Sequence, residues 1–309
     1  MTRTREDGKE EVFSACIKHD DTKYLGGNKS SSVVATKLQG RPRTGINYDK
    51  ANEFCANRGD WITMIDYLEY CAIQALCYIE YANFDNQAAL NTNLTSDGFK
   101  QGGLGAGVTN LAWDRWTAFN GNNPIVQTYW TAEHNIGNGS TNGDHYELGN
   151  YNTDGSNLNT YPAVYRGILN FFGDIWTFIR DVVIVNRNAN YNSVYLLKKG
   201  VNHADITIDN IQDKCYFIGD QANSNNFITE FDFRFGPYFI PNKVGTNKKA
   251  DYNWIRGNNG QDTDKAVCVL LLGGRAADGS PAGSGYFDSH WVRSDSSAPV
   301  GFFTTVKLD

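Results

Sequence analysis

The sequence lacks a long hydrophobic run and carries little charge of either sign. No apolar stretch in the 309 residues approaches the roughly 18 residues of a membrane-spanning helix, so membrane insertion is not expected. Charged residues make up 20% of the chain and the net charge is −6, with no basic cluster longer than the pairs Lys198-Lys199 and Lys248-Lys249. Nucleic-acid binders usually carry a basic stripe. The composition therefore predicts no nucleic-acid partner.

Motifs for metal binding and catalysis are also missing. The six cysteines form no CxxC or CxxH pair and there is no HxxxH pair, so no zinc site is indicated; most should be buried apolar thiols. A GxSxG elbow, an HExxH motif and the kinase motifs are absent. Glu133-His134 and Asp144-His145 lie in Asn- and Gly-rich stretches typical of solvated loops. The sequence predicts no catalytic residue, no metal and no cofactor.

The N-terminal region has the character of an attachment segment. Met1 to Lys9 contain no apolar core of a secretory signal peptide, which predicts synthesis in the cytoplasm and export only within an assembly. Residues 1–45 are polar and irregular, and we expect them to form an arm. Residues 46–309 contain no repeat and no flexible linker, and we expect one main domain.

Two helices and many short strands are expected within 46–309. Tyr48, Ala51 and Phe54 recur at helical spacing after Asn47, a suitable N-cap. A second apolar stripe predicts a helix that buries Met64, Tyr67, Leu68, Cys71, Ala72, Ala75, Leu76 and Ile79. Short runs of β-branched and aromatic residues predict strands at 126–131, 182–185, 194–197, 206–208, 231–235, 267–272 and 302–306. This order predicts an α+β fold with long loops.

Two blocks resemble a known domain family. The segment from Tyr48 to Ala72 resembles the two-helix block of C-type-lectin-like domains of the formylglycine-generating-enzyme subgroup. The segment from Tyr165 to Phe178 is similar to that subgroup's GxxNxxGNxWxW signature, with Asp174 in place of an Asn and Phe178 in place of the second Trp. Gly173 would allow the turn, and alternation would place Trp176 and Phe178 on one strand face. The resemblance implies a C-type-lectin-like fold, with the two early helices packed on short antiparallel strands.

The C-terminal block adds a second resemblance. Leu272 to Phe287 and Val300 to Val306 are similar to the last segment of variable proteins of diversity-generating retroelements, including phage tail proteins, although Phe303 stands where the family often has Arg. In that family, adenine-directed mutagenesis rewrites chosen codons. The resemblance implies a variable ligand-binding region at about 273–309.

The resemblance also implies which residues vary. The fixed scaffold would include Gly273, Gly274, Trp291 and Gly301. The exchangeable, ligand-contacting residues would be Arg275, Ala276, Asp278, Ser280, Ser284, Tyr286, Asp288, His290, Arg293 and Ser294. An alternative interpretation makes the Ser, Asp and Gly residues ordinary turn formers. For Trp291, a core anchor and a ligand contact both remain open.

The function implied is binding without catalysis. A variable protein of this family would be displayed on the tail fibre or tip of a bacterial or archaeal virus, as a homo-oligomer or a monomer. It would recognise a protein or glycan on a target cell. The alternatives are a non-diversified fibre or glycan-binding module and a formylglycine-generating-type oxidase. The oxidase needs paired copper-binding cysteines, and Cys215 and Cys268 have no close partner in sequence. Calcium-dependent sugar-binding sites of this fold contain a Glu-Pro-Asn or Gln-Pro-Asp triplet, and the sequence has neither.

Overall fold

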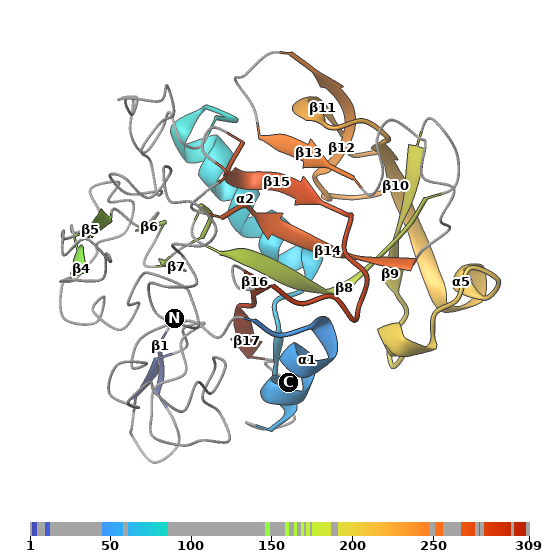
Figure 1. The fold of residues 1–309 in the computed structure, drawn as a ribbon, viewed down its shortest axis with the longest axis horizontal. Coiled ribbons are helices and arrows are strands. Elements are labelled where there is room, and N and C mark those ends of the chain that lie inside the picture. Colours follow the sequence, from blue (N-terminus) through green and yellow to red (C-terminus); the bar gives the residue numbers. More distant parts are fainter. Residues whose placement is uncertain are drawn as a thin grey trace.

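The fold is mixed α+β, as the sequence predicts, with two early helices and a nine-stranded, mostly antiparallel sheet (Figure 1). The computed structural model describes residues 2–4, 10–12, 45–57, 61–85, 146–148, 158–160, 164–165, 168–169, 171–173, 175–186, 191–246, 251–255, 267–275, 278, 281–297 and 300–306. In these residues, no helix has the length and hydropathy needed to cross a membrane. The division into a 1–45 arm and a 46–309 domain stays a prediction.

Both helices begin at capped positions. Helix α1 (Tyr48–Ala56) has Asn47 as its N-cap, as predicted, with the Asn47 side chain accepting a hydrogen bond from the Lys50 amide. Helix α2 (Tyr67–Tyr81) begins with a capping box, in which Asp66 and Glu69 each bond to the other's backbone amide. It ends at Ala82, which has a positive φ of 48°. These local signals explain where each helix starts.

The buried face of α2 differs from the predicted one. The helix buries Tyr67, Tyr70, Cys71, Gln74, Cys77 and Tyr78, while Leu68, Ala72, Leu76 and Ile79 are exposed. The prediction that these four are core residues is therefore wrong. The tyrosines can be buried because their hydroxyls find acceptors: Tyr67 donates to the Phe239 carbonyl and Tyr70 to the Ser284 carbonyl, both at 2.9 Å.

The large sheet has the strand order β10-β9-β8-β14-β15-β13-β11-β12, with β16 paired to β8 outside that path. The strands are β8 (Trp176–Asn186), β9 (Tyr191–Leu197), β10 (Cys215–Ala222), β11 (Asn226–Asp232), β12 (Ile240–Gly245), β13 (Tyr252–Trp254), β14 (Val267–Gly273), β15 (Gly283–Asp288) and β16 (Val300–Gly301). All pairs are antiparallel except β13 with β15 and β16 with β8. The parallel β13–β15 pair places two distant chain segments side by side.

Most of the predicted strands that fall in described residues are present. The runs at 182–185, 194–197 and 267–272 lie in β8, β9 and β14. The predicted strand at 206–208 is wrong, because these residues are irregular chain after the short 3-10 helix η4 (His203–Asp205). The predicted strand at 231–235 is only partly present, because β11 ends at Asp232. Residues 126–131 lie outside the described residues.

Four two-stranded sheets are also present in the described residues. They are β1 (Thr2–Thr4) with β2 (Glu10–Val12), β3 (Ile62–Met64) with β17 (Thr304–Val306), β4 (Tyr146–Leu148) with β5 (Leu158–Thr160), and β6 (Val164–Tyr165) with β7 (Ile168–Leu169); the short helix α5 (Ile211–Lys214) precedes β10. The β3–β17 pair joins the segment between the two helices to the end of the described chain.

The two helices cover opposite faces of the sheet. Residues of α2 belong to a core cluster with Leu270, Leu272 and Phe287. Residues of α1 belong to another cluster, with Leu271 and Tyr286, which are adjacent in sequence to those strand residues. Because successive strand side chains point to opposite faces, the two clusters lie on the two sides of β14 and β15. In Figure 1, α2 passes behind these strands. Both strands are therefore buried on both faces, which determines the character of the site below.

The predicted features of β8 are confirmed. Trp176 and Phe178 belong to the same core cluster, as alternation predicts, and Gly173 has a φ of 81°, in the left-handed region that favours glycine.

Candidate ligand-binding surface

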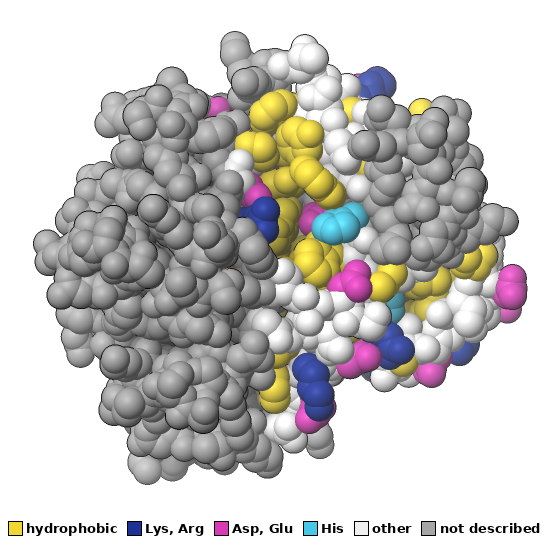
Figure 2. Space-filling model, in the orientation of Figure 1, with side chains coloured by type: hydrophobic (Ala, Val, Ile, Leu, Met, Phe, Trp, Pro, Cys, Tyr) yellow, Lys and Arg dark blue, Asp and Glu magenta, His cyan; other side chains and the backbone are white. Residues whose placement is uncertain are grey.

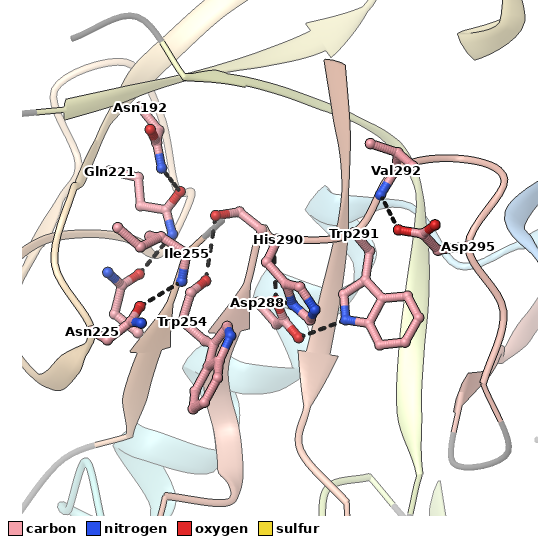
Figure 3. Close-up of polar contacts among 12 residues, drawn as sticks. Asn192, Gln221, Asn225, Trp254, Ile255, Asp288, His290, Trp291, Val292 and Asp295 are labelled. Carbon is pink, nitrogen blue, oxygen red and sulfur yellow. Dashed lines mark hydrogen bonds and ion pairs between the residues drawn. The ribbon is translucent and has the colours of Figure 1, made fainter. Parts of the chain in front are cut away.

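The candidate site lies where the parallel strands β13 and β15 end together (Figure 3). Trp254 and Asp288 are register partners at these ends. Beyond them, the Ser289 amide donates a hydrogen bond to the Trp254 carbonyl at 2.9 Å, so the chain that leaves β15 stays beside β13. Parallel pairing brings the same ends of two strands to one edge, which here gathers Trp254 and the segment 288–291 on one surface.

A buried carboxylate organises this surface. Asp288 is 2% exposed. Its Oδ1 accepts a hydrogen bond from the His290 amide at 3.0 Å and lies 2.7 Å from His290 Nδ1, and its Oδ2 accepts from the Trp291 indole N–H at 2.9 Å. Burying a carboxylate is costly unless it is hydrogen-bonded. Asp288 therefore fixes the orientation of both rings while it satisfies its own oxygens.

The two rings continue a row of aromatic contacts that runs from solvent into the core. The ring centroids are 4.9 Å apart for His290 and Trp291, and 6.3 Å apart for His290 and Trp254. Tyr252 lies 6.2 Å from Trp254 and 5.6 Å from Tyr286, which packs on the buried Trp176 at 4.4 Å. Figure 2 shows hydrophobic side chains gathered over this part of the sheet, with a histidine at their border.

Trp254 is the exposed member of the row. It is 41% exposed, although an indole usually contributes most to stability when it is buried. Trp254 belongs to a strand whose neighbours fix it on both sides, so this exposure is a property of a rigid element and not of a loose loop.

Buried amides hold β13 in place behind the surface. Gln221 Nε2 donates to Asn253 Oδ1 at 2.7 Å, and Asn253 Nδ2 donates to the carbonyls of Ala222 and Ser224, both at 2.9 Å. The Asn225 side chain accepts from the Ile255 amide at 2.8 Å (Figure 3). Such satisfied buried networks favour one arrangement over alternatives. The strand that carries Trp254 is thus rigidly positioned.

A second buried carboxylate lies beneath the two strands. Asp251 Oδ2 accepts from the Tyr78 hydroxyl at 2.7 Å and from the Gly285 amide at 2.6 Å. Burial raises the pKa of Asp251 to about 7, because desolvation disfavours its charged form. A Cβ atom at Gly283 or Gly285 would clash with the Asp251 carboxylate. These two glycines are required by the close approach of β15 to Asp251.

Ion pairs border the surface. Arg293 Nη1 lies 3.0 Å from Asp49 Oδ1 at the start of α1, and Arg275 Nε lies 2.8 Å from Asp278 Oδ1. Burial raises the pKa of Asp278 to about 6, and the charges of Arg275 and Asp288 lower and raise it, respectively. The margin of the surface therefore carries charges of both signs, held in pairs.

The four predicted scaffold residues lie in described parts of the chain, and their scaffold role stays a prediction. Gly273 and Gly274 have φ values of 97° and 75°, where a side chain would be strained. Gly301 is buried in β16, and Trp291 is held by Asp288.

The predicted ligand-contacting residues divide into two groups. Arg275, His290 and Arg293 are partly exposed and Ser294 is exposed. Ser284, Tyr286 and Asp288 are buried, because β15 lies between the clusters of α1 and α2, so they lie beneath the surface where ligand contacts were expected. Asp278 is only slightly exposed. Ala276 and Ser280 lie outside the described residues.

Sequence reasoning missed Trp254 as a site residue. Its only signal is the alternation Tyr252-Asn253-Trp254, which places two aromatic rings on one strand face and an amide on the other. Its approach to Asp288 depends on a parallel register between segments far apart in sequence, which no local pattern specifies.

The sequence contains other groups that could carry chemistry. Glu133-His134 and Asp144-His145 lie outside the described residues. Within the described part of the chain, no group of three or more His, Cys, Asp or Glu residues could hold a metal ion. The five described cysteines are buried thiols, as predicted, and burial raises the pKa of Cys71 and Cys77 to about 12.

No family model matches the chain, and no curated protein matches it. Function must therefore be argued from the residues and their geometry.

Proposed function

We propose that this chain is a non-enzymatic ligand-binding protein, and that it binds at the surface formed by Trp254, His290 and Trp291. The observation that carries the proposal is the exposure of Trp254 beside two rings that a buried carboxylate holds in place. Rigid aromatic side chains supply a large contact area at low entropic cost when a partner binds, and Trp and Arg are enriched where binding energy is concentrated.

The fold is proposed to be C-type-lectin-like. The proposal rests on the resemblance of segments 48–72 and 165–178, and the placement of the first segment's helices on opposite sheet faces is compatible with it. The sheet itself supplies the rigid support that a binding surface at strand ends needs.

Retroelement diversification is proposed for the exposed positions of the C-terminal segment. Arg275, His290, Arg293 and Ser294 would vary, since surface substitutions usually change stability by less than about 0.5 kcal/mol. Ser284, Tyr286 and Asp288 would stay constant, because they belong to the core. The proposal includes display on the tail of a virus that infects bacteria or archaea, as the resemblance implies.

Sequencing of the locus across a population tests the diversification. Adenine-specific substitutions should concentrate at the codons of the exposed positions, beside a reverse-transcriptase gene and a near-copy of codons 273–309. An invariant locus with neither element would reject diversification and leave the binding proposal untouched.

Cell binding tests the surface itself. The full-length chain, fluorescently labelled, is incubated with a panel of bacterial and archaeal cells and measured by flow cytometry. We expect selective binding that Trp254→Ala abolishes. Trp61→Ala, which removes an indole of similar exposure (37%) ahead of β3, is the matched control and should bind as the wild type does. Equal binding by the wild type and Trp254→Ala, or no binding to any cell in the panel, would contradict the proposal.

A further inference from the structure

We propose that the surface recognises a neutral sugar ring, stacked on the exposed indole of Trp254. The inference rests on the proposed binding function and adds the chemical class of the ligand. It also assigns a role to a residue of β13, which lies outside the C-terminal segment 273–309.

The charges around Trp254 favour an uncharged ligand. Asp288 is enclosed by His290 and Trp291, so both of its oxygens face protein donors and not solvent. A charged ligand that sought to pair with Asp288 would have to compete with these donors. A neutral ligand meets no such cost.

The arrangement of the rings favours a ligand with one apolar face and a polar rim. Trp254 presents an exposed aromatic ring, and the imidazole of His290 stands beside it at an interplanar angle of 59°. A pyranose has this character, since its C–H groups lie on one face and its hydroxyls point outward along the ring edge. The C–H face would cover the indole while hydroxyls reach the imidazole of His290.

A purely apolar ligand fits less well. The imidazole of His290 lies beside Trp254 and is 36% exposed, so covering it with hydrocarbon would remove water from a polar group and offer no hydrogen bond in return. Sugar hydroxyls can both donate and accept, so they suit a margin that contains both kinds of group.

Trp254 would act as a constant anchor. Because it lies on β13 and its strand is fixed by the Asn253 amide contacts, its position does not depend on which residues occupy 290 and 293. Under diversification, the stacking contact would persist while the residues around it select among sugars.

The experiment measures binding of the full-length protein to immobilised polysaccharides. Neutral probes are laminarin, mannan, dextran and galactan; hyaluronan and chitosan supply anionic and cationic counterparts. We expect binding to at least one neutral polysaccharide, with little binding to the charged pair. Trp254→Ala should weaken it by tenfold or more, a range comparable to the loss of one aromatic stacking contact of about 1–3 kcal/mol. Trp254→Phe should weaken it less, and Trp61→Ala should not change it.

The outcomes separate this inference from the proposed function. No binding to any neutral polysaccharide, or equal binding by Trp254→Ala, overturns the sugar assignment. If cells are still bound in a Trp254-dependent way, the binding surface stands and its ligand is of another class, such as a protein. Circular dichroism shows whether each variant is folded. If Trp254→Ala does not fold, the binding of Trp254→Phe, which keeps an aromatic ring, is compared with that of the wild type instead.

Discussion

Strand β15 and the segment that follows it both mix polar and aromatic residues, but they differ in burial. Gly283–Asp288 contains two glycines, a serine, a tyrosine, a phenylalanine and an aspartate, and every residue in it is buried. Residues 290–294 also mix polar and aromatic side chains, and all are at least partly exposed. The difference comes from position: β15 is central in the sheet with a helix-bearing cluster on each face, whereas the next residues leave the sheet. Polarity alone therefore does not identify a surface residue in this chain.

The largest effect is expected from adding a methyl group inside β15. In Gly285→Ala, the new Cβ would lie 2.5 Å from Asp251 Oδ2 and from the Tyr78 hydroxyl, so buried polar atoms would have to move. We expect a loss of at least about 4 kcal/mol in the free energy of unfolding, measured by urea denaturation. Ser294→Ala, after the strand, is the control and should unfold as the wild type does. Equal stability of the two variants would contradict the described burial of β15.

Protonation of Asp251 provides the next largest effect. Its pKa is about 7 in the folded state and about 4 in the unfolded chain, so the folded state binds the proton more tightly. The resulting stabilisation is complete below about pH 4 and is lost as the pH rises through 7. The slope is at most about 1.4 kcal/mol per pH unit.

Comparison with Asp251→Asn isolates this effect. The stability of the wild type relative to the variant should fall from pH 4 to pH 7, by roughly 3 kcal/mol in total. Other buried carboxyls, such as Asp181, whose pKa burial raises to about 6, are present in both proteins and cancel in the difference. A pH-independent difference would show that Asp251 does not titrate in this range.

Asp288 lies at the boundary between the two regions, and its replacement should affect both. Asp288→Ala leaves the Trp291 indole N–H and the His290 amide without their acceptor, at an expected cost of about 1–3 kcal/mol. Thermal unfolding measures this cost, and binding should weaken because the two rings lose their orientation. Asp288→Asn keeps an acceptor oxygen, and we expect it to retain more of both properties. Full binding by the alanine variant would exclude the orienting role.

The smallest effect is expected at the exposed margin. Arg293→Ala removes one partner of the ion pair with Asp49, and exposed pairs contribute about 0–1 kcal/mol. Chemical denaturation should show a change in this range. A change in stability comparable to that of Asp288→Ala would place Arg293 in the structural core of the surface.

Local signals in the sequence predicted much of the framework. The N-cap at Asn47, the helical periodicity after it and the β-branched runs of β8, β9 and β14 all correspond to described elements. The positive φ angles of Gly273 and Gly274 agree with their expected scaffold role. Each of these features depends on residues close together in the chain.

The remaining features depend on long-range packing. The face that α2 buries is set by acceptors for tyrosine hydroxyls, one of them the Ser284 carbonyl, which periodicity does not reveal. Burial of Ser284, Tyr286 and Asp288 depends on the core clusters that lie on the two faces of β15. The site residue Trp254 was missed because its approach to Asp288 is fixed by a parallel strand register.

That parallel register has a consequence for the order of assembly. Between β13 and β15 the chain also forms β14, which pairs with β8 and with β15. Contacts of this kind close long loops and are entropically expensive to form early in folding. The row of rings at Trp254 is therefore complete only when the centre of the sheet is complete. A ligand that binds there would bind the folded state and not partly folded states. Raising the ligand concentration would therefore increase the free energy of unfolding.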